Sequence, residues 1–168
     1  NEHDASIQRA VVRRWIQQNG FRLPSTLKLN HLFSDTIPAR PDRNPMLEWQ
    51  GCEIRRYQNQ LYIMQPLIVF DASRVISVEE GVEINLPSPF QHVTTASLLA
   101  HRSDNTATLQ IRFRQGGERF IPPGRSHHVT VKHWLQVQKV PPWWRDCVPL
   151  LYSNDRLIAI IIPEGSFT

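Results

Sequence analysis

The longest helical periodicity in this chain covers residues 4–19, and the rest is divided into short apolar runs by proline and turn residues. At about 100° per residue, five apolar side chains fall on one face of that stretch, namely Ile7, Val11, Val12, Trp15 and Ile16. Asp4 or Ser6 can cap the start of the helix, and Asn19-Gly20 supplies a left-handed stop. The pattern therefore predicts one amphipathic helix whose apolar face is core.

The remainder of the first half predicts a short helix and then a small sheet. Ser25 follows Pro24 and can start a second helix, which presents Leu29, Leu32, Phe33 and Ile37 on one side. Three short strands follow, over residues 46–50, 53–57 and 61–64, with a hairpin turn at residues 58–60. We expect residues 1–66 to form a helix-plus-sheet domain.

The second half predicts mostly strands. Leu109, Ile111 and Phe113 alternate with polar residues, which is typical of a half-buried strand. A helix is predicted over residues 129–139, and strands are predicted over residues 67–70, 148–152 and 156–162. The fold class is therefore α+β, with residues 67–80 as a linker or joining strand and residues 81–168 as a β-rich domain with one helix.

Charge is distributed unevenly along the 168 residues, whose formal net charge is +4. Residues 1–66 hold 9 basic and 6 acidic residues, residues 67–108 hold 2 and 5, and residues 109–168 hold 8 and 4. Two basic segments around an acidic one are typical of a protein that binds a polyanion, although an ordinary solvated surface gives the same count. The densest apolar run, residues 157–162, is too short to cross a membrane.

A search for catalytic motifs finds none. The sequence has no Gly-rich phosphate loop, and its two cysteines, Cys52 and Cys147, lie far apart and read as reduced cytoplasmic thiols. His127, His128 and His133 lack the carboxylate partners of a metal site and are better candidates for a binding surface. We therefore expect no catalytic residue, no metal and no cofactor in this chain.

One set of motifs in the second half is far more specific than composition. It reads RFRQGGE at 112–118, GR at 124–125, LQ at 135–136, VPPWWRD at 140–146 and PLLY at 149–152. The set closely resembles the C-terminal domain of bacterial tRNA(Ile)-lysidine synthetases over roughly residues 109–160. That resemblance implies a compact β-sandwich-like domain with one helix, similar to a module of the phenylalanyl-tRNA synthetase β subunit.

The first half adds to the resemblance. RRW at 13–15, PS at 24–25 and EIRRYQ at 53–58 resemble the substrate-recognition domain of the same family. The second basic residue of the family's LKK motif is replaced by His133, and the glycine usual after the last strand is missing. Because the chain begins with Asn1 and lacks the family's N-terminal catalytic domain, we expect it to be a piece of a longer protein.

The resemblance implies a function for the parent protein. Enzymes of this family ligate lysine to the wobble cytidine of the CAU anticodon of isoleucine tRNA, with ATP and Mg in the N-terminal catalytic domain. The present chain is then the cytoplasmic tRNA-recognition portion, inactive alone. Its expected partners are that tRNA and the catalytic domain, and a second copy of the chain is a further candidate.

Basic residues within the motif segments are the candidate tRNA contacts, because arginine donors match phosphate geometry. We predict two contact surfaces, the first made of Arg112, Arg114, Arg125, Lys132 and Arg145, and the second of Arg9, Arg13, Arg55 and Arg56. For each arginine the alternative is a surface ion pair, for example of Arg145 with Asp146 or Asp155. For the chain as a whole, the alternative is a structural or self-association domain without tRNA contact.

Overall fold

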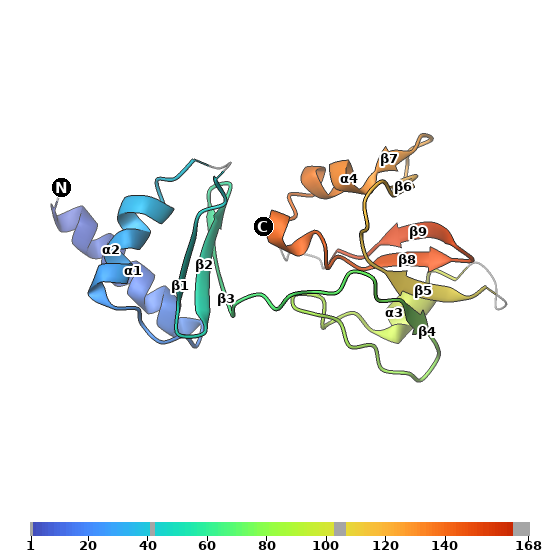
Figure 1. The fold of residues 1–168 in the computed structure, drawn as a ribbon, viewed down its shortest axis with the longest axis horizontal. Coiled ribbons are helices and arrows are strands. Elements are labelled where there is room, and N and C mark those ends of the chain that lie inside the picture. The colour runs from blue at the N-terminus through green and yellow to red at the C-terminus, as the bar shows by residue number, and fades with distance from the viewer. Residues whose placement is uncertain (1, 41–42, 103–106, 163–168) are drawn as a thin grey trace. The chain divides into compact units, whose positions relative to one another are not determined.

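The computed structural model describes residues 2–40, 43–102 and 107–162 (Figure 1). The chain forms two compact units, unit 1 over Asn1–Ile68 and unit 2 over Val69–Thr168. Unit 1 combines helices with a three-stranded sheet, and unit 2 is built on a four-stranded antiparallel sheet with a smaller two-stranded sheet. The predicted α+β class is confirmed.

Unit 1 begins with helix α1, Glu2–Gln18, so the predicted cap is wrong: Asp4 and Ser6 lie inside the helix. Its end agrees with the prediction, because Gly20 has φ +80° and the Phe21 amide donates to the Ile16 carbonyl at 3.2 Å. Ile16 is fully buried, but Ile7 and Val11 are 51 % and 61 % exposed. At about 100° per residue, Ile7 and Val11 lie about 180° and about 140° around the helix from Ile16, so they face away from the core that Ile16 enters.

The second helix starts as the sequence predicts. Ser25 caps α2, Thr26–His31, by accepting a hydrogen bond from the Lys28 amide at 3.3 Å. The helix continues as a π-helical segment, η1, Leu32–Thr36. Leu29 and Leu32 are buried, so the predicted apolar side of this helix does face the core.

The sheet of unit 1 is an antiparallel meander of β1, Met46–Trp49, β2, Cys52–Tyr57, and β3, Gln60–Met64. Ile54 in the central strand pairs with Leu47 and Ile63. Helices α1 and α2 lie against this sheet (Figure 1), and the core between them is formed by Ile16, Leu29, Leu32, Trp49, Cys52 and Ile54.

The large sheet of unit 2 has the order β4-β5-β8-β9, and all neighbouring strands are antiparallel. Its strands are β4, Ile76–Val78, β5, Leu109–Arg112, β8, Leu150–Ser153, and β9, Arg156–Ile160. The two-stranded sheet pairs β6, Arg119–Phe120, with β7, Val129–Thr130. Leu109, Ile111 and Phe113 are buried, as their alternation predicts.

Two helices and a 3-10 turn accompany the sheets in the described part of unit 2. Helix α4, Val131–Val137, lies inside the predicted span and buries Val131 and Leu135. A short helix, α3, Thr95–Leu99, occupies the proline-containing stretch where no long element was expected. The 3-10 turn η3, Pro142–Trp144, directs Trp144 into the core, where it is 8 % exposed.

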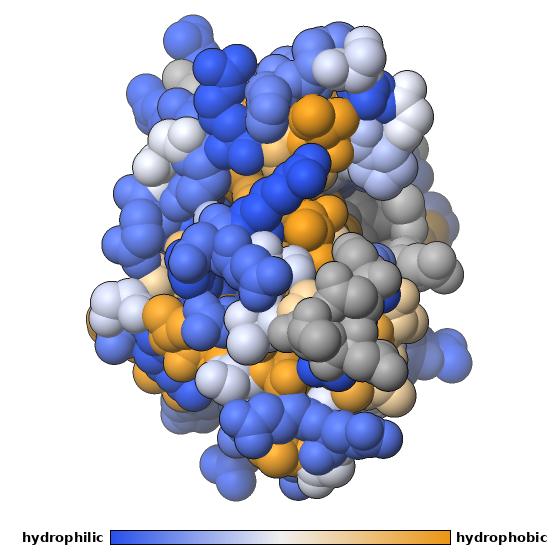
Figure 2. All heavy atoms as spheres, turned by 90° about the vertical axis from the view of Figure 1, so that its right-hand side faces the viewer, coloured by the Kyte–Doolittle hydropathy of each residue, from blue (hydrophilic) through white to orange (hydrophobic). Residues whose placement is uncertain are grey.

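None of the helices among the described residues is long and apolar enough to cross a membrane. Figure 2 shows one face of the molecule, on which hydrophilic residues surround smaller patches of apolar ones. Isolated apolar residues on such a surface are normal for a folded protein.

The two cysteines are predicted to be unreactive in the folded chain. Burial raises the pKa of the Cys52 thiol and of the Cys147 thiol to about 11 from the ordinary 9.0. Only the thiolate is nucleophilic, so neither thiol should react with a thiol reagent at pH 8 until the chain is unfolded. The folded state should also lose stability as pH rises from about 9 to 11, because only the unfolded thiols ionise readily there. Reagent titration with and without denaturant checks the first point, and rapid labelling of the folded chain would contradict it.

Candidate nucleic-acid interface

The cations predicted on α1 are exposed. Arg13 is on the solvent side of the helix, and within the described part of the chain its guanidinium has no ion-pair partner. The Arg9 guanidinium lies 5.6 Å from the centroid of the Phe33 ring, which is a cation–π contact. Both charges are therefore available to an external anion, and the contact with Phe33 restricts only Arg9.

Arg55 is held by a buried acid within its own strand. Its Nε donates to Glu53 Oε1 at 2.8 Å, and its Nη2 donates to Glu53 Oε2 at 3.2 Å. The side chain of Glu53 is only 3 % exposed, and that of Arg55 is 21 % exposed. The two residues share a face of β2 because they are two positions apart. Arg55 thus neutralises a carboxylate of the unit 1 interior.

Arg56 points to the opposite face of β2, and its guanidinium also has a partner within unit 1. Its Nη1 donates a hydrogen bond to the backbone carbonyl of Ala39, in the segment that follows η1. That bond links the sheet to the connection leading into β1. Arg55 and Arg56 stay predicted tRNA contacts, but each has a structural role of its own.

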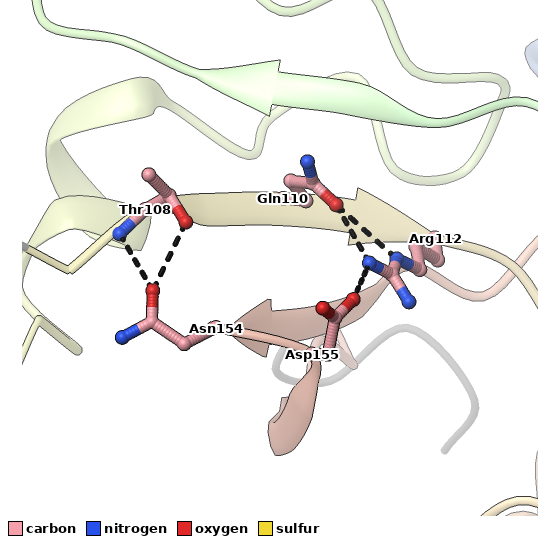
Figure 3. Close-up of polar contacts among 5 residues, drawn as sticks. All are labelled: Thr108, Gln110, Arg112, Asn154 and Asp155. Carbon is pink, nitrogen blue, oxygen red and sulfur yellow. Dashed lines mark hydrogen bonds and ion pairs between the residues drawn. The ribbon is translucent and has the colours of Figure 1, made fainter.

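In unit 2, Arg112 is the centre of a polar cluster on the sheet (Figure 3). Its guanidinium donates to Gln110 Oε1, with Nη2 at 2.8 Å, and forms an ion pair with Asp155. It also lies over the Tyr152 ring, 4.7 Å from the centroid. Three neighbours on β5, β8 and the β8–β9 turn therefore fix the position of this guanidinium.

The turn that carries Asp155 is itself fixed to Thr108, the residue just before β5. Asn154 and Asp155 have φ values of +45° and +66°, a conformation that these two residue types tolerate well. The Asn154 Oδ1 accepts hydrogen bonds from the Thr108 amide at 3.2 Å and from the Thr108 hydroxyl at 3.0 Å (Figure 3). This arrangement holds the Asp155 carboxylate in front of Arg112.

Arg114 and Arg145 are anchored at the other end of the same motif. Arg114 forms an ion pair with Asp146, and its side chain is 22 % exposed. Arg145 Nε donates to the carbonyl of Val140 at 2.9 Å, next to the end of α4. The two aspartates considered as partners for Arg145 form ion pairs with Arg112 and Arg114.

The remaining predicted cations are free of such anchors. Arg125 and Lys132 are both exposed, and among the described residues neither side chain has an ion-pair partner. His127, His128 and His133 are exposed as well. Within residues 2–40, 43–102 and 107–162, no three His, Cys, Asp or Glu side chains are placed to hold a metal ion.

The RFRQGGE motif folds into a turn made by its glycines and its glutamate. Gly116 and Gly117 have φ values of +108° and +87°, which L side chains rarely adopt. Glu118 Oε1 accepts hydrogen bonds from the amides of Gln115 and Gly116, the latter at 2.8 Å. The two glycines therefore supply the backbone conformation of the turn, and Glu118 closes it.

Directly after this turn lies an open cavity of about 510 Å³, which the sequence analysis did not foresee. It is bordered by β6 and by the β8–β9 hairpin, and Tyr152 and Asp155 of the Arg112 cluster are part of its wall. Two further arginines, Arg119 and Arg156, also line it. The sequence could have pointed to these two arginines only by their positions, next to the glycine turn and at the start of the last strand. Neither residue differs in sequence from an ordinary surface arginine.

Comparison with known proteins gives matches over both units. Residues 1–62 match the family model described as TilS substrate binding domain, and residues 109–162 match the one described as TilS substrate C-terminal domain. The tRNA(Ile)-lysidine synthase of Coxiella burnetii is 36 % identical over 92 % of this chain. Those of Pectobacterium atrosepticum and Xanthomonas campestris pv. campestris are 33 % and 30 % identical over 90 % and 94 % of it.

The chain spans 35 % of the length of each of these relatives. Both family models match in the order that the sequence motifs predict, one in each structural unit. The chain therefore belongs to the tRNA(Ile)-lysidine synthase family, of which it represents the substrate-binding and C-terminal domains.

Proposed function

We propose that this chain holds isoleucine tRNA with a CAU anticodon while a separate catalytic domain ligates lysine to the wobble cytidine in the cytoplasm. The observation that carries the proposal is the match of residues 1–62 to a substrate-binding domain. The names of the relatives support the formation of lysidine on an isoleucine tRNA. ATP and Mg are proposed to act in the separate catalytic domain. The present chain is proposed to be inactive alone.

The geometry supports different roles for two groups of cations, those that are exposed without an ion-pair partner and those that are held by a carboxylate. Arg9, Arg13, Arg125 and Lys132 are exposed and can neutralise phosphates, the main source of affinity for nucleic acid. Arg112 and Arg114 carry carboxylate partners that fix their direction. An anchored guanidinium still has donors left, because it presents five N–H groups and one ion pair uses one or two of them. Such groups orient a phosphate backbone with little loss of side-chain entropy.

The alternative is a domain that orients the catalytic domain or associates with itself. Fluorescence anisotropy with labelled isoleucine tRNA at low salt separates the two roles, with sedimentation of the free chain run in parallel. We expect saturable tRNA binding by the chain and tighter binding of isoleucine tRNA than of methionine tRNA. A self-associating chain without tRNA affinity would favour the alternative, and lysidine formed from ATP, lysine and tRNA would contradict the proposed inactivity.

A further inference from the structure

The open cavity beside the GGE turn combines an apolar wall with cations. Leu157 and Ile158 of β9 line it together with Phe120 and Ile121. Two successive strand residues normally point to opposite faces of a sheet. Both reach this cavity because the β8–β9 register shifts between Leu151 and Tyr152, which leaves an extra residue on β9. Bulges of this kind redirect side chains next to functional sites.

The acidic side chains that line the cavity already have hydrogen-bond or ion-pair partners, whereas its two arginines have no ion-pair partner among the described residues. Glu118 already accepts two backbone amides, and Asp155 is already paired with Arg112. Arg119 and Arg156 are exposed, and in the described part of the chain neither has an ion-pair partner. The charge without an ion-pair partner among these lining residues is therefore positive, although both signs are present in the wall.

Tyr152 adds a fixed polar group to the wall. Its ring is held by the Arg112 guanidinium, and burial raises the pKa of its hydroxyl above the ordinary 10.0. The hydroxyl stays protonated at neutral pH and can both donate and accept a hydrogen bond. The cavity thus offers an apolar surface, a neutral hydroxyl and two cations within about 510 Å³, a size typical of small-molecule sites.

We propose that this cavity binds one unpaired RNA nucleotide, with its phosphate at Arg119 and Arg156 and its base against Leu157 and Ile158. Guanidinium groups match phosphate oxygens in charge and geometry. Unpaired bases are recognised in proteins by packing on side-chain surfaces and by hydrogen bonds to their edges. The proposal rests on the proposed function, which it deepens by giving tRNA an unpaired contact in unit 2.

A free nucleotide has the same chemistry, so the test has two arms. In the first, the full chain is titrated with cytidine monophosphate, cytidine and inorganic phosphate while the Ile158 methyl and Arg156 Nε–H signals are followed by NMR. We expect the monophosphate to shift both signals at lower concentration than cytidine or phosphate. Equal responses to phosphate and to the monophosphate would overturn the role of the apolar wall.

The second arm compares an RNA hairpin with and without a four-nucleotide unpaired 3′ extension. The extension should tighten binding several-fold, because it adds a phosphate contact at Arg119 and Arg156 and a base packed on the apolar wall. The gain should disappear in the Arg119→Gln/Arg156→Gln variant and persist in Arg74→Gln, an exposed arginine away from the cavity. Equal affinity for the two hairpins would overturn this proposal while leaving the proposed function standing. Absence of binding to either hairpin and to tRNA at low salt would contradict the proposed function itself.

Discussion

Replacing Arg55 with alanine is expected to lower the free energy of unfolding of unit 1 by about 3–5 kcal/mol. The variant leaves the Glu53 carboxylate, 3 % exposed, without the guanidinium that now contacts both of its oxygens. A buried carboxylate that has lost its partner keeps the full cost of its desolvation. Urea unfolding followed by the NMR signal of the Trp49 indole N–H measures the effect in unit 1, since that N–H binds the Arg22 carbonyl at 2.7 Å.

Two further variants decide how this result is read. Arg13→Ala removes an exposed arginine from the same unit and should change stability by less than about 0.5 kcal/mol. Adding Glu53→Gln to Arg55→Ala should recover part of the loss, because no charge is then left buried. If Arg55→Ala unfolds at the same urea concentration as the unchanged chain, the Glu53–Arg55 pair does not stabilise unit 1. If Arg55→Ala is destabilised as expected, a loss of tRNA affinity in this variant reports unfolding of unit 1 and not the loss of a phosphate contact.

The second large effect is expected from exposed cations. The triple variant Arg13→Gln, Arg125→Gln, Lys132→Gln should reduce the slope of log affinity for isoleucine tRNA against log salt by about 3. Each of these side chains is exposed and unpaired among the described residues, so its removal costs little stability and one phosphate contact. Binding isotherms at four or more salt concentrations give the slope for each protein.

A matched control has the same change in charge at other exposed positions. Arg22→Gln, Arg74→Gln, Lys139→Gln also removes two arginines and one lysine, none of them a predicted contact. We expect this control to change the slope by clearly less than the first triple variant. Equal slopes for the two triple variants would mean that net charge alone governs binding and that the predicted contacts bind phosphate no better than other exposed cations.

Local sequence signals predicted the parts of the fold that depend on neighbouring residues. The Ser25 cap and the Gly20 stop are each set by the local preferences of one or two residues. The burial of Glu53 beneath Arg55 had no such local signal in the sequence. Ile7 and Val11 are exposed because they lie on the side of α1 opposite Ile16, and the sequence pattern did not show which part of the broad apolar face packs on the sheet.

The candidate site depends on contacts that are remote in sequence. Arg112 and Asp155 are 43 positions apart, and Arg114 and Asp146 are 32 apart, so their pairing requires the β5–β8–β9 arrangement. The cavity depends on a one-residue bulge in β9, for which Leu157 and Ile158 carry no distinctive signature. The sequence therefore identified which cations belong to the motifs, and the structure separated the anchored ones from the exposed ones.

The most direct test of the account is the salt dependence of isoleucine tRNA binding by the unchanged 168-residue chain. We predict saturable binding whose affinity falls linearly on a log–log plot as salt rises, with a slope that counts several phosphate contacts. The same titration with methionine tRNA should give a similar slope but weaker binding. Absence of binding at low salt, or an affinity that does not respond to salt, would contradict a tRNA-holding role for these two domains.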